Sequence, residues 1–77
     1  MTDLKYINFD TIGIVIFETH VDHAQMARAM GYIPLSAGFV HIDQSGSRCY
    51  GKSISLNLES WPKDSVLLNK RIGSHGF

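Results

Sequence analysis

The histidine and cysteine side chains are the residues of this sequence most able to bind a metal or act in catalysis. His20 and His23 stand three residues apart, a spacing that puts both imidazoles on one side of a helix, and imidazole is a common zinc ligand. A metal site needs at least one more ligand. The remaining donors, His41, Cys49 and His75, follow no recognised ligand spacing. We therefore interpret His20 and His23 as surface residues near a helix start and predict no metal and no cofactor.

Cys49 is the only cysteine of the chain, which excludes an internal disulfide and fits the reducing cytoplasm. Cys49 and His41 fall on the two strands of an expected hairpin, so a cysteine–histidine nucleophilic pair is one alternative. Such a pair needs an activated thiol, an oxyanion site and a cleft, for which 77 residues leave little room. We predict a structural Cys49 and no catalytic residue.

Basic and aromatic residues suggest nucleic-acid binding as an alternative function. Tyr50 and Phe39 fall on expected strands, where aromatic rings can form a stacking platform for bases. The cations that would accompany them are Arg48, Lys52, Lys63, Lys70 and Arg71. However, seven Lys and Arg balance seven Asp and Glu, so no net positive charge attracts a phosphate backbone. Aromatic residues on strands also pack in cores and cross-strand pairs, so nucleic acid is not the favoured partner.

Several large apolar side chains are candidates for a protein interface. Trp61 precedes Pro62 at an expected helix start, where its ring can pack against the first turns of the helix as a hydrophobic staple. Tryptophan is also enriched among interface anchors. The candidate interaction patch consists of Trp61, Tyr32, Ile33 and Phe77.

The strands that must position these residues follow from hydrophobic periodicity. The expected strands cover residues 5–9, 12–17, 39–42 and 48–58. Residues 12–17 are uncharged and rich in β-branched side chains, and both alternating sets are apolar apart from Gly13. We interpret this run as the central strand of a sheet. In the last strand we expect a bulge at Gly51, followed by alternation that places Ile54, Leu56 and Leu58 on the packed face.

Two helices are expected between and after these strands. Residues 20–30 place apolar side chains at helical spacing, with Thr19 as the N-cap and Gly31 as a left-handed C-cap. The second helix opens at Ser60, with Pro62 in its first turn. Its expected buried face consists of Val66, Leu67, Leu68 and Ile72.

The predicted fold is therefore one α+β domain, residues 1–77, with the order ββαββα. We expect a small, mostly antiparallel sheet of about four strands with two helices on one face. The second face of the strand at residues 12–17, with Val15 and Phe17, would then need cover from a second copy or a partner. Apolar residues make up 44% of the chain and charged residues 18%, which favours association of so small a domain.

Three stretches carry a resemblance to other proteins. Residues 36–40, 49–56 and 60–65 read SAGFV, CYGKSISL and SWPKDS. In these stretches the sequence resembles small uncharacterised proteins of bacteria and their phages or mobile elements. The resemblance covers roughly the C-terminal half, implies a compact accessory protein and brings no active site. One class of such proteins, the anti-CRISPR inhibitors, acts by occluding a surface of a larger host complex.

These observations predict a small non-enzymatic accessory protein of the cytoplasm that acts through protein–protein contacts. It would be a homodimer, or an inhibitor or modulator of a larger partner. No membrane association is expected, because the chain start lacks the basic residues and apolar run of a signal peptide and residues 12–17 are too few to span a bilayer. A nucleic-acid-binding regulatory protein is the alternative, and a metal- or cysteine-dependent enzyme is the least favoured one.

Overall fold

The structure of the chain, a computed structural model, describes residues 2–73 and the side chains of residues 3–70. The elements in chain order are β1 (Thr2–Phe9), β2 (Gly13–Phe17), α1 (His23–Met30), β3 (Pro34–Asp43), β4 (Gly46–Tyr50), β5 (Lys52–Ser53), β6 (Leu58–Glu59) and α2 (Pro62–Gly73). The expected order of strands and helices is confirmed, except that a short hairpin replaces the second half of the fourth expected strand.

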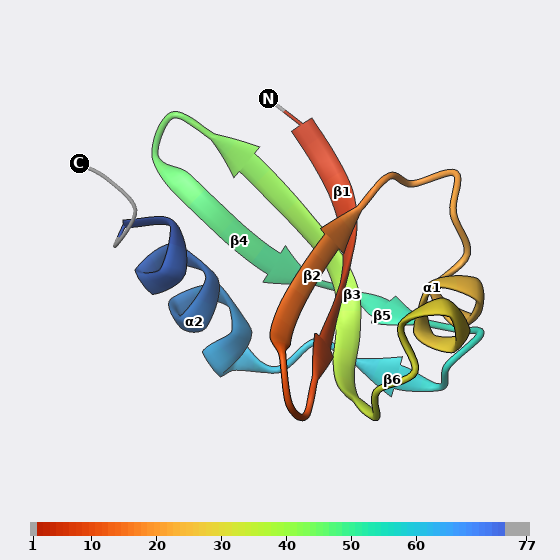
Figure 1. The fold of residues 1–77 in the computed structure, drawn as a ribbon. Helices are drawn as coiled ribbons and strands as arrows, with labels where there is room; N and C mark the ends of the chain where they lie inside the picture. The colour runs from red at the N-terminus through yellow and green to blue at the C-terminus, as the bar shows by residue number, and fades with distance from the viewer. Residues whose placement is uncertain (1, 74–77) are drawn as a thin grey trace.

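The first four strands form one antiparallel sheet in the order β2-β1-β3-β4 (Figure 1). This sheet and its two helices confirm the predicted α+β class. The prediction that residues 12–17 form the central strand is wrong, because β2 is an edge strand and β1 and β3 occupy the centre. β2 is apolar on both sides because both faces of the sheet are covered, a requirement that applies to an edge strand as much as to a central one.

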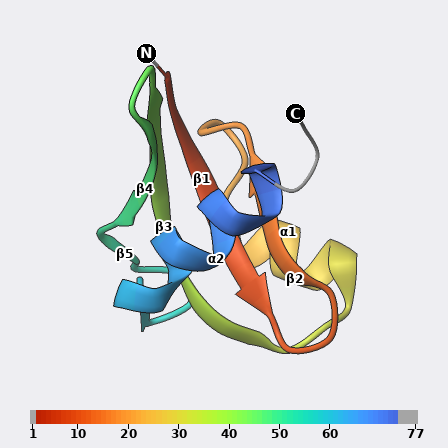
Figure 2. The ribbon, with the colours of Figure 1, turned by 90° about the vertical axis from the view of Figure 1, so that its left-hand side faces the viewer.

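The two helices lie on opposite faces of the sheet, as Figure 1 and the turned view in Figure 2 both show. The core on the α2 side contains Tyr6, Ile14, Val40 and Leu68. The core on the α1 side contains Ile7, Phe9, Phe17 and Ala37. The expectation that both helices share one face does not hold, because neighbouring strand residues such as Tyr6 and Ile7 point to opposite faces and each face needs cover. Phe17 is already covered within the chain, so the sheet itself does not require a second copy.

The first helix starts three residues later than expected. Asp22, not Thr19, is the N-cap: its carboxylate accepts from the Ala24 backbone N–H at 3.2 Å, and the Gln25 side chain accepts from the Asp22 N–H at 3.3 Å. This reciprocal pair is a capping box. The predicted C-cap is confirmed, because Gly31 has φ 76° and closes the helix. The shift makes His23 the first helical residue, and its side chain is buried.

The chain turns out of the main sheet at Gly51, which has φ 74°, and forms the β5–β6 hairpin on the α1 side. The expected alternation over residues 53–58 holds only in part: Leu56 and Leu58 pack against the core, but Ser53 is buried and Ile54 is 86% exposed. The Ser53 hydroxyl accepts from the Leu56 N–H at 3.2 Å, and Asn57 takes the left-handed conformation at φ 55°. These turn residues reverse the chain where the sequence pattern predicted one continuous strand.

The second helix begins at Pro62 and not at Ser60, so Pro62 does lie in its first turn, but the helix buries a different face from the one expected. Leu68 is buried, whereas Val66 and Leu67 are 65% and 44% exposed. The other inward position, one turn before Leu68, belongs to Asp64, which is fully buried. The side chain of Ile72, also expected on the buried face, lies outside the described residues. No helix in this part of the chain is long and apolar enough to cross a membrane.

Candidate functional site

A pocket of about 460 Å³ opens on the α1 side of the sheet, next to the N-terminal end of α1. Strands β1, β3 and β4, the start of α1 and the β5–β6 hairpin all contribute to its wall. Its lining residues are Lys5, Asp22, His23, Phe39, Tyr50, Gly51, Lys52, Ile54 and Ser55. We call this the sheet pocket. Its volume lies in the range of about 300 to 1,000 Å³ that is typical of small-ligand sites.

Two aromatic rings form one wall of the sheet pocket. Phe39 and Tyr50 are direct cross-strand partners, and their rings stack with centroids 5.7 Å apart and an interplanar angle of 28°. Gly51 permits this packing, because a Cβ at this position would lie 3.1 Å from the Phe39 ring. Tyr50 remains 38% exposed. The sequence pattern identified both rings, and the strand register brings them together.

Two cations, Lys5 and Lys52, line the sheet pocket, and a third, Arg48, lies next to it on β4. Lys5 pairs with Phe39 across β1 and β3, so Lys5, Phe39 and Tyr50 form one row across the sheet. Arg48 precedes Tyr50 by two residues on the same face of β4, and Lys52 lines the pocket after the turn. The half-buried Lys5 ammonium donates to the Val21 carbonyl at 2.9 Å. Among the described residues, no carboxylate lies within ion-pair distance of any of these three cations.

His23 closes the inner end of the sheet pocket. It is 4% exposed, its Nε2 lies 2.9 Å from the Gly38 carbonyl oxygen, and its ring meets the edges of Phe17 and Phe39. Burial lowers the pKa of His23 below its ordinary value of 6.5, with a smaller contribution from Lys5. A neutral imidazole that faces a carbonyl must carry its proton on that nitrogen. We therefore assign the tautomer with the proton on Nε2, which donates to Gly38.

The two histidines considered as a candidate metal pair are separated by this arrangement, and the interpretation of His23 as a surface residue is wrong because its side chain is buried. His20 is exposed and precedes α1, whereas His23 is turned into the core and uses Nε2 on a backbone carbonyl. No group of three or more histidine, cysteine or acidic residues in the described part of the chain is arranged to hold a metal ion.

Because His23 is buried, we expect the protein to be less stable in mild acid than at neutral pH. Its folded-state pKa is lowered, so the unfolded chain binds the proton more tightly. The stabilising contribution is therefore fully present above pH 6.5 and is lost as pH falls through the lower folded-state pKa. Urea titrations at neutral pH and in mild acid should give a smaller free energy of unfolding in acid. His23→Gln should weaken this dependence, whereas the exposed His20→Gln should not. An identical pH dependence in His23→Gln would contradict the assignment.

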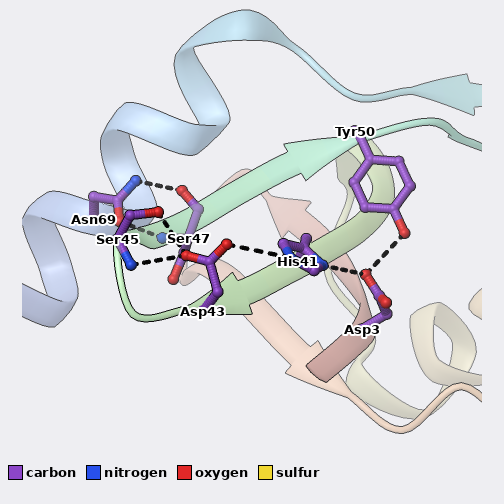
Figure 3. Close-up of polar contacts among 7 residues, drawn as sticks. All are labelled: Asp3, His41, Asp43, Ser45, Ser47, Tyr50 and Asn69. Atoms are coloured by element: carbon purple, nitrogen blue, oxygen red, sulfur yellow. Dashed lines mark hydrogen bonds and ion pairs between the residues drawn. The ribbon is translucent and has the colours of Figure 1, made fainter. Parts of the chain in front are cut away.

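A polar network continues from the sheet pocket toward the β3–β4 turn (Figure 3). The His41 ring bridges two carboxylates, with Nδ1 3.0 Å from Asp3 and Nε2 3.3 Å from Asp43. The Tyr50 hydroxyl also donates to Asp3 at 3.1 Å, and the Ser45 hydroxyl donates to Asp43 at 2.6 Å. The hydrogen bond from His41 holds the pKa of Asp3 below its ordinary value. The network fixes the Tyr50 ring at the mouth of the pocket.

The Cys49–His41 pair does not form. Cys49 is opposite Val40 and faces α2, whereas His41 is opposite Arg48 and faces the other side of the sheet. Burial raises the pKa of the Cys49 thiol to about 11, with a further contribution from the nearby Asp64 carboxylate. A thiol of this kind is a poor nucleophile near neutral pH. Cys49 is half-buried, which fits a structural role.

The predicted nucleic-acid contacts fall into two groups. Arg48 and Lys52 lie beside the sheet pocket, whereas Lys63 and Lys70 lie on α2, which packs on the opposite face. The side chain of Arg71 lies outside the described residues. The four cations whose side chains are described therefore do not form one patch. Lys5, which the sequence analysis did not select, joins the first group through the β1–β3 register.

The predicted interaction residues are also spread over the molecule. Tyr32 and Ile33 are 41% and 64% exposed. Trp61 is half-buried, with the Lys63 ammonium 4.6 Å from its ring centroid in a cation–π contact. Phe77 lies outside the described residues. The sequence analysis missed Leu35, which is exposed directly after Ile33 and Pro34.

The chain matches no protein-family model, no curated protein and no solved structure. The resemblance to accessory proteins of bacteria and their phages stays a prediction. Function must therefore be argued from the geometry of the described residues.

Proposed function

We propose that this chain is a small non-enzymatic protein that acts by binding another protein, either a second copy or a larger partner that it inhibits or modulates. The observation that carries this proposal is an apolar corner in the connection from α1 to β3, made of Tyr32, Ile33 and Leu35. These side chains are 41%, 64% and 37% exposed. Adjacent exposed apolar side chains are typical of protein interaction sites.

The backbone holds the apolar corner in a fixed position. The Asp10 N–H donates to the Ile33 carbonyl at 2.9 Å, and the Ile33 N–H donates to the Asp10 carboxylate at 3.3 Å. The Tyr32 ring meets the edge of the buried Phe9 ring at a centroid distance of 6.3 Å. The two hydrogen bonds of Ile33 and the ring contact of Tyr32 therefore hold this part of the corner in one conformation, so binding would lose little conformational entropy.

The groups with the greatest catalytic potential have structural partners, which supports a binding role. His23 donates to the Gly38 carbonyl, and the Cys49 thiol is held neutral by burial. Asp64 is buried and accepts hydrogen bonds from Tyr6 and Ser36. We place the protein in the cytoplasm, where its single thiol stays reduced, as an accessory protein of bacterial, phage or mobile-element origin.

Two exposed apolar residues of nearly equal exposure allow a matched test. Ile33 is 64% exposed in the apolar corner, and Val66 is 65% exposed on α2. Sedimentation velocity and pull-down should detect self-association or a retained partner for the native chain. Ile33→Asp should abolish that association and Val66→Asp should preserve it. A strict monomer that retains nothing would contradict the proposal, and equal loss in both variants would reject the corner as the binding surface.

A further inference from the structure

We propose that the sheet pocket binds single-stranded nucleic acid, with one base stacked on Tyr50 and the adjacent phosphates held by Lys5, Arg48 and Lys52. This is a binding activity separate from the apolar corner. Its cations differ from the five candidates named from the sequence, because it excludes the lysines of α2 and includes Lys5.

The aromatic wall supplies the stacking surface. The Tyr50 ring packs on Phe39 on one side, is 38% exposed, and has its hydroxyl tied to Asp3 at 3.1 Å. A ring that is backed by a second ring and anchored at its hydroxyl is preorganised for a flat partner. Every base has a π-face, so stacking here accepts bases of different sequence.

The cations supply the charge that the ligand must balance. The Lys5 ammonium has three donors, and the Val21 carbonyl accepts one of them at 2.9 Å. Lys5 is half-buried, and it forms no ion pair with a described carboxylate. A charge in that position is stabilised by an anion that enters the pocket. Phosphate matches this requirement, because a lysine ammonium binds it as a point charge.

Two of the nearby carboxylates, Asp22 and Asp3, already accept hydrogen bonds. Asp22 is the acidic lining residue, and its carboxylate accepts from the Ala24 N–H at 3.2 Å. Asp3 accepts from the Tyr50 hydroxyl and faces the His41 ring. Their hydrogen bonds hold Asp22 and Asp3 in place. Two of the cations also lie near a carboxylate, because Glu59 is the cross-strand partner of Lys52 and the Arg48 charge acts on Asp3. None of the three cations forms an ion pair with a described carboxylate, so an incoming phosphate can still bind them.

The salt dependence of binding should be shallow, because the chain has no net charge and few phosphates are contacted. Neutralising about three phosphates of a single strand gives a slope near −2 in log–log form, so affinity should fall about 20-fold from about 50 to about 200 mM salt. A dependence this small would distinguish a local pocket from an extended basic surface.

The test uses fluorescence anisotropy of a short labelled oligothymidylate with the full chain. Lys52→Ala should weaken binding severalfold and make the salt slope shallower by about 0.7, the expected effect of losing one phosphate contact. Lys63→Ala, which removes an exposed lysine from α2, should leave the affinity unchanged. Tyr50→Leu should weaken binding about tenfold or more, whereas Tyr50→Phe, which keeps the ring, should retain most of it. Circular dichroism confirms that each variant is folded.

Three results would overturn the proposal. The first is no anisotropy change at low salt, and the second is an equal loss of affinity in Lys52→Ala and Lys63→Ala. The third is displacement of the oligonucleotide by thymidine monophosphate at equal concentration, which would assign the pocket to a free nucleotide. Each result leaves the apolar corner untouched, so Ile33→Asp tests the two binding activities separately.

Discussion

Replacement of Asp64 by asparagine is expected to lower the free energy of unfolding by about 3 kcal/mol or more. The Asp64 side chain is fully buried, and donors converge on its carboxylate. The Tyr6 hydroxyl lies at 2.5 Å, the Ser36 hydroxyl at 2.7 Å, the Trp61 N–H at 2.9 Å and the Asn8 amide at 3.4 Å. Three of these donors share the oxygen Oδ2, and the negative charge of the carboxylate strengthens their hydrogen bonds. Asparagine would offer them a neutral oxygen and would turn its own amide N–H groups toward the Asn8 amide, which also donates.

The size of this loss matters because the domain is small. A chain of this length has a total stability of about 4 to 12 kcal/mol, so Asp64→Asn would remove a large fraction of it. Urea denaturation followed by Trp61 fluorescence would measure the change. Glu59→Gln, the same chemical change at an exposed position, is the control and should shift stability by less than about 0.5 kcal/mol. A similarly small effect for Asp64→Asn would mean that the network contributes little.

Local patterns in the sequence predict most elements of this fold but not their arrangement. Gly31 and Pro62 mark helix ends through backbone conformation, which a residue type determines locally. The position of β2 at the edge of the sheet is a property of strand order, and an apolar run looks the same at an edge as at the centre when both faces are covered. The placement of the helices on opposite faces also depends on tertiary packing.

The buried face of α2 shows a second limit of sequence reasoning. Hydrophobicity favoured Val66 and Leu67 over Asp64, yet Asp64 is buried and the two apolar residues are exposed. Asp64 is buried because Tyr6 and Ser36 provide its hydrogen bonds from positions 58 and 28 residues away in the chain. A polar residue enters a core when such distant partners exist, and a helical periodicity cannot reveal them.

The sheet pocket was predictable in part. Aromatic residue type and strand position identified Phe39 and Tyr50, and their proximity follows from a hairpin around residues 43–46. Lys5 lies in the first strand and reaches the same row only through the β1–β3 pairing, whose register no local signal specifies. Positive charge alone groups the α2 lysines with Arg48, and the packing of α2 on the opposite face of the sheet separates them.

Gly38→Ala is expected to be the second strongly destabilising change, with a loss of about 3 kcal/mol. Gly38 of β3 lies close to the backbone of Tyr50 and Gly51, at the turn from β4 to β5. A Cβ at this position would overlap the Tyr50 carbonyl oxygen and would lie 3.3 Å from the Gly51 carbonyl group. These neighbours are backbone atoms, so relief requires β3 and β4 to move apart. The Phe39–Tyr50 stack lies at this point, and its near-ultraviolet circular dichroism should weaken in the folded variant.

Gly31→Ala is the control that separates close packing from backbone conformation. Gly31 has φ 76° and no atom within 4 Å of a Cβ at its position, so alanine there meets conformational strain alone and should cost about 1 kcal/mol. Gly38 requires no left-handed conformation, so its larger loss would come from the close approach of two strands. Urea denaturation of both variants gives the comparison. Equal losses in the free energy of unfolding would mean that small backbone shifts relieve the steric overlap at Gly38. The turn at Gly51 would then be more adaptable than its packing against Phe39 implies.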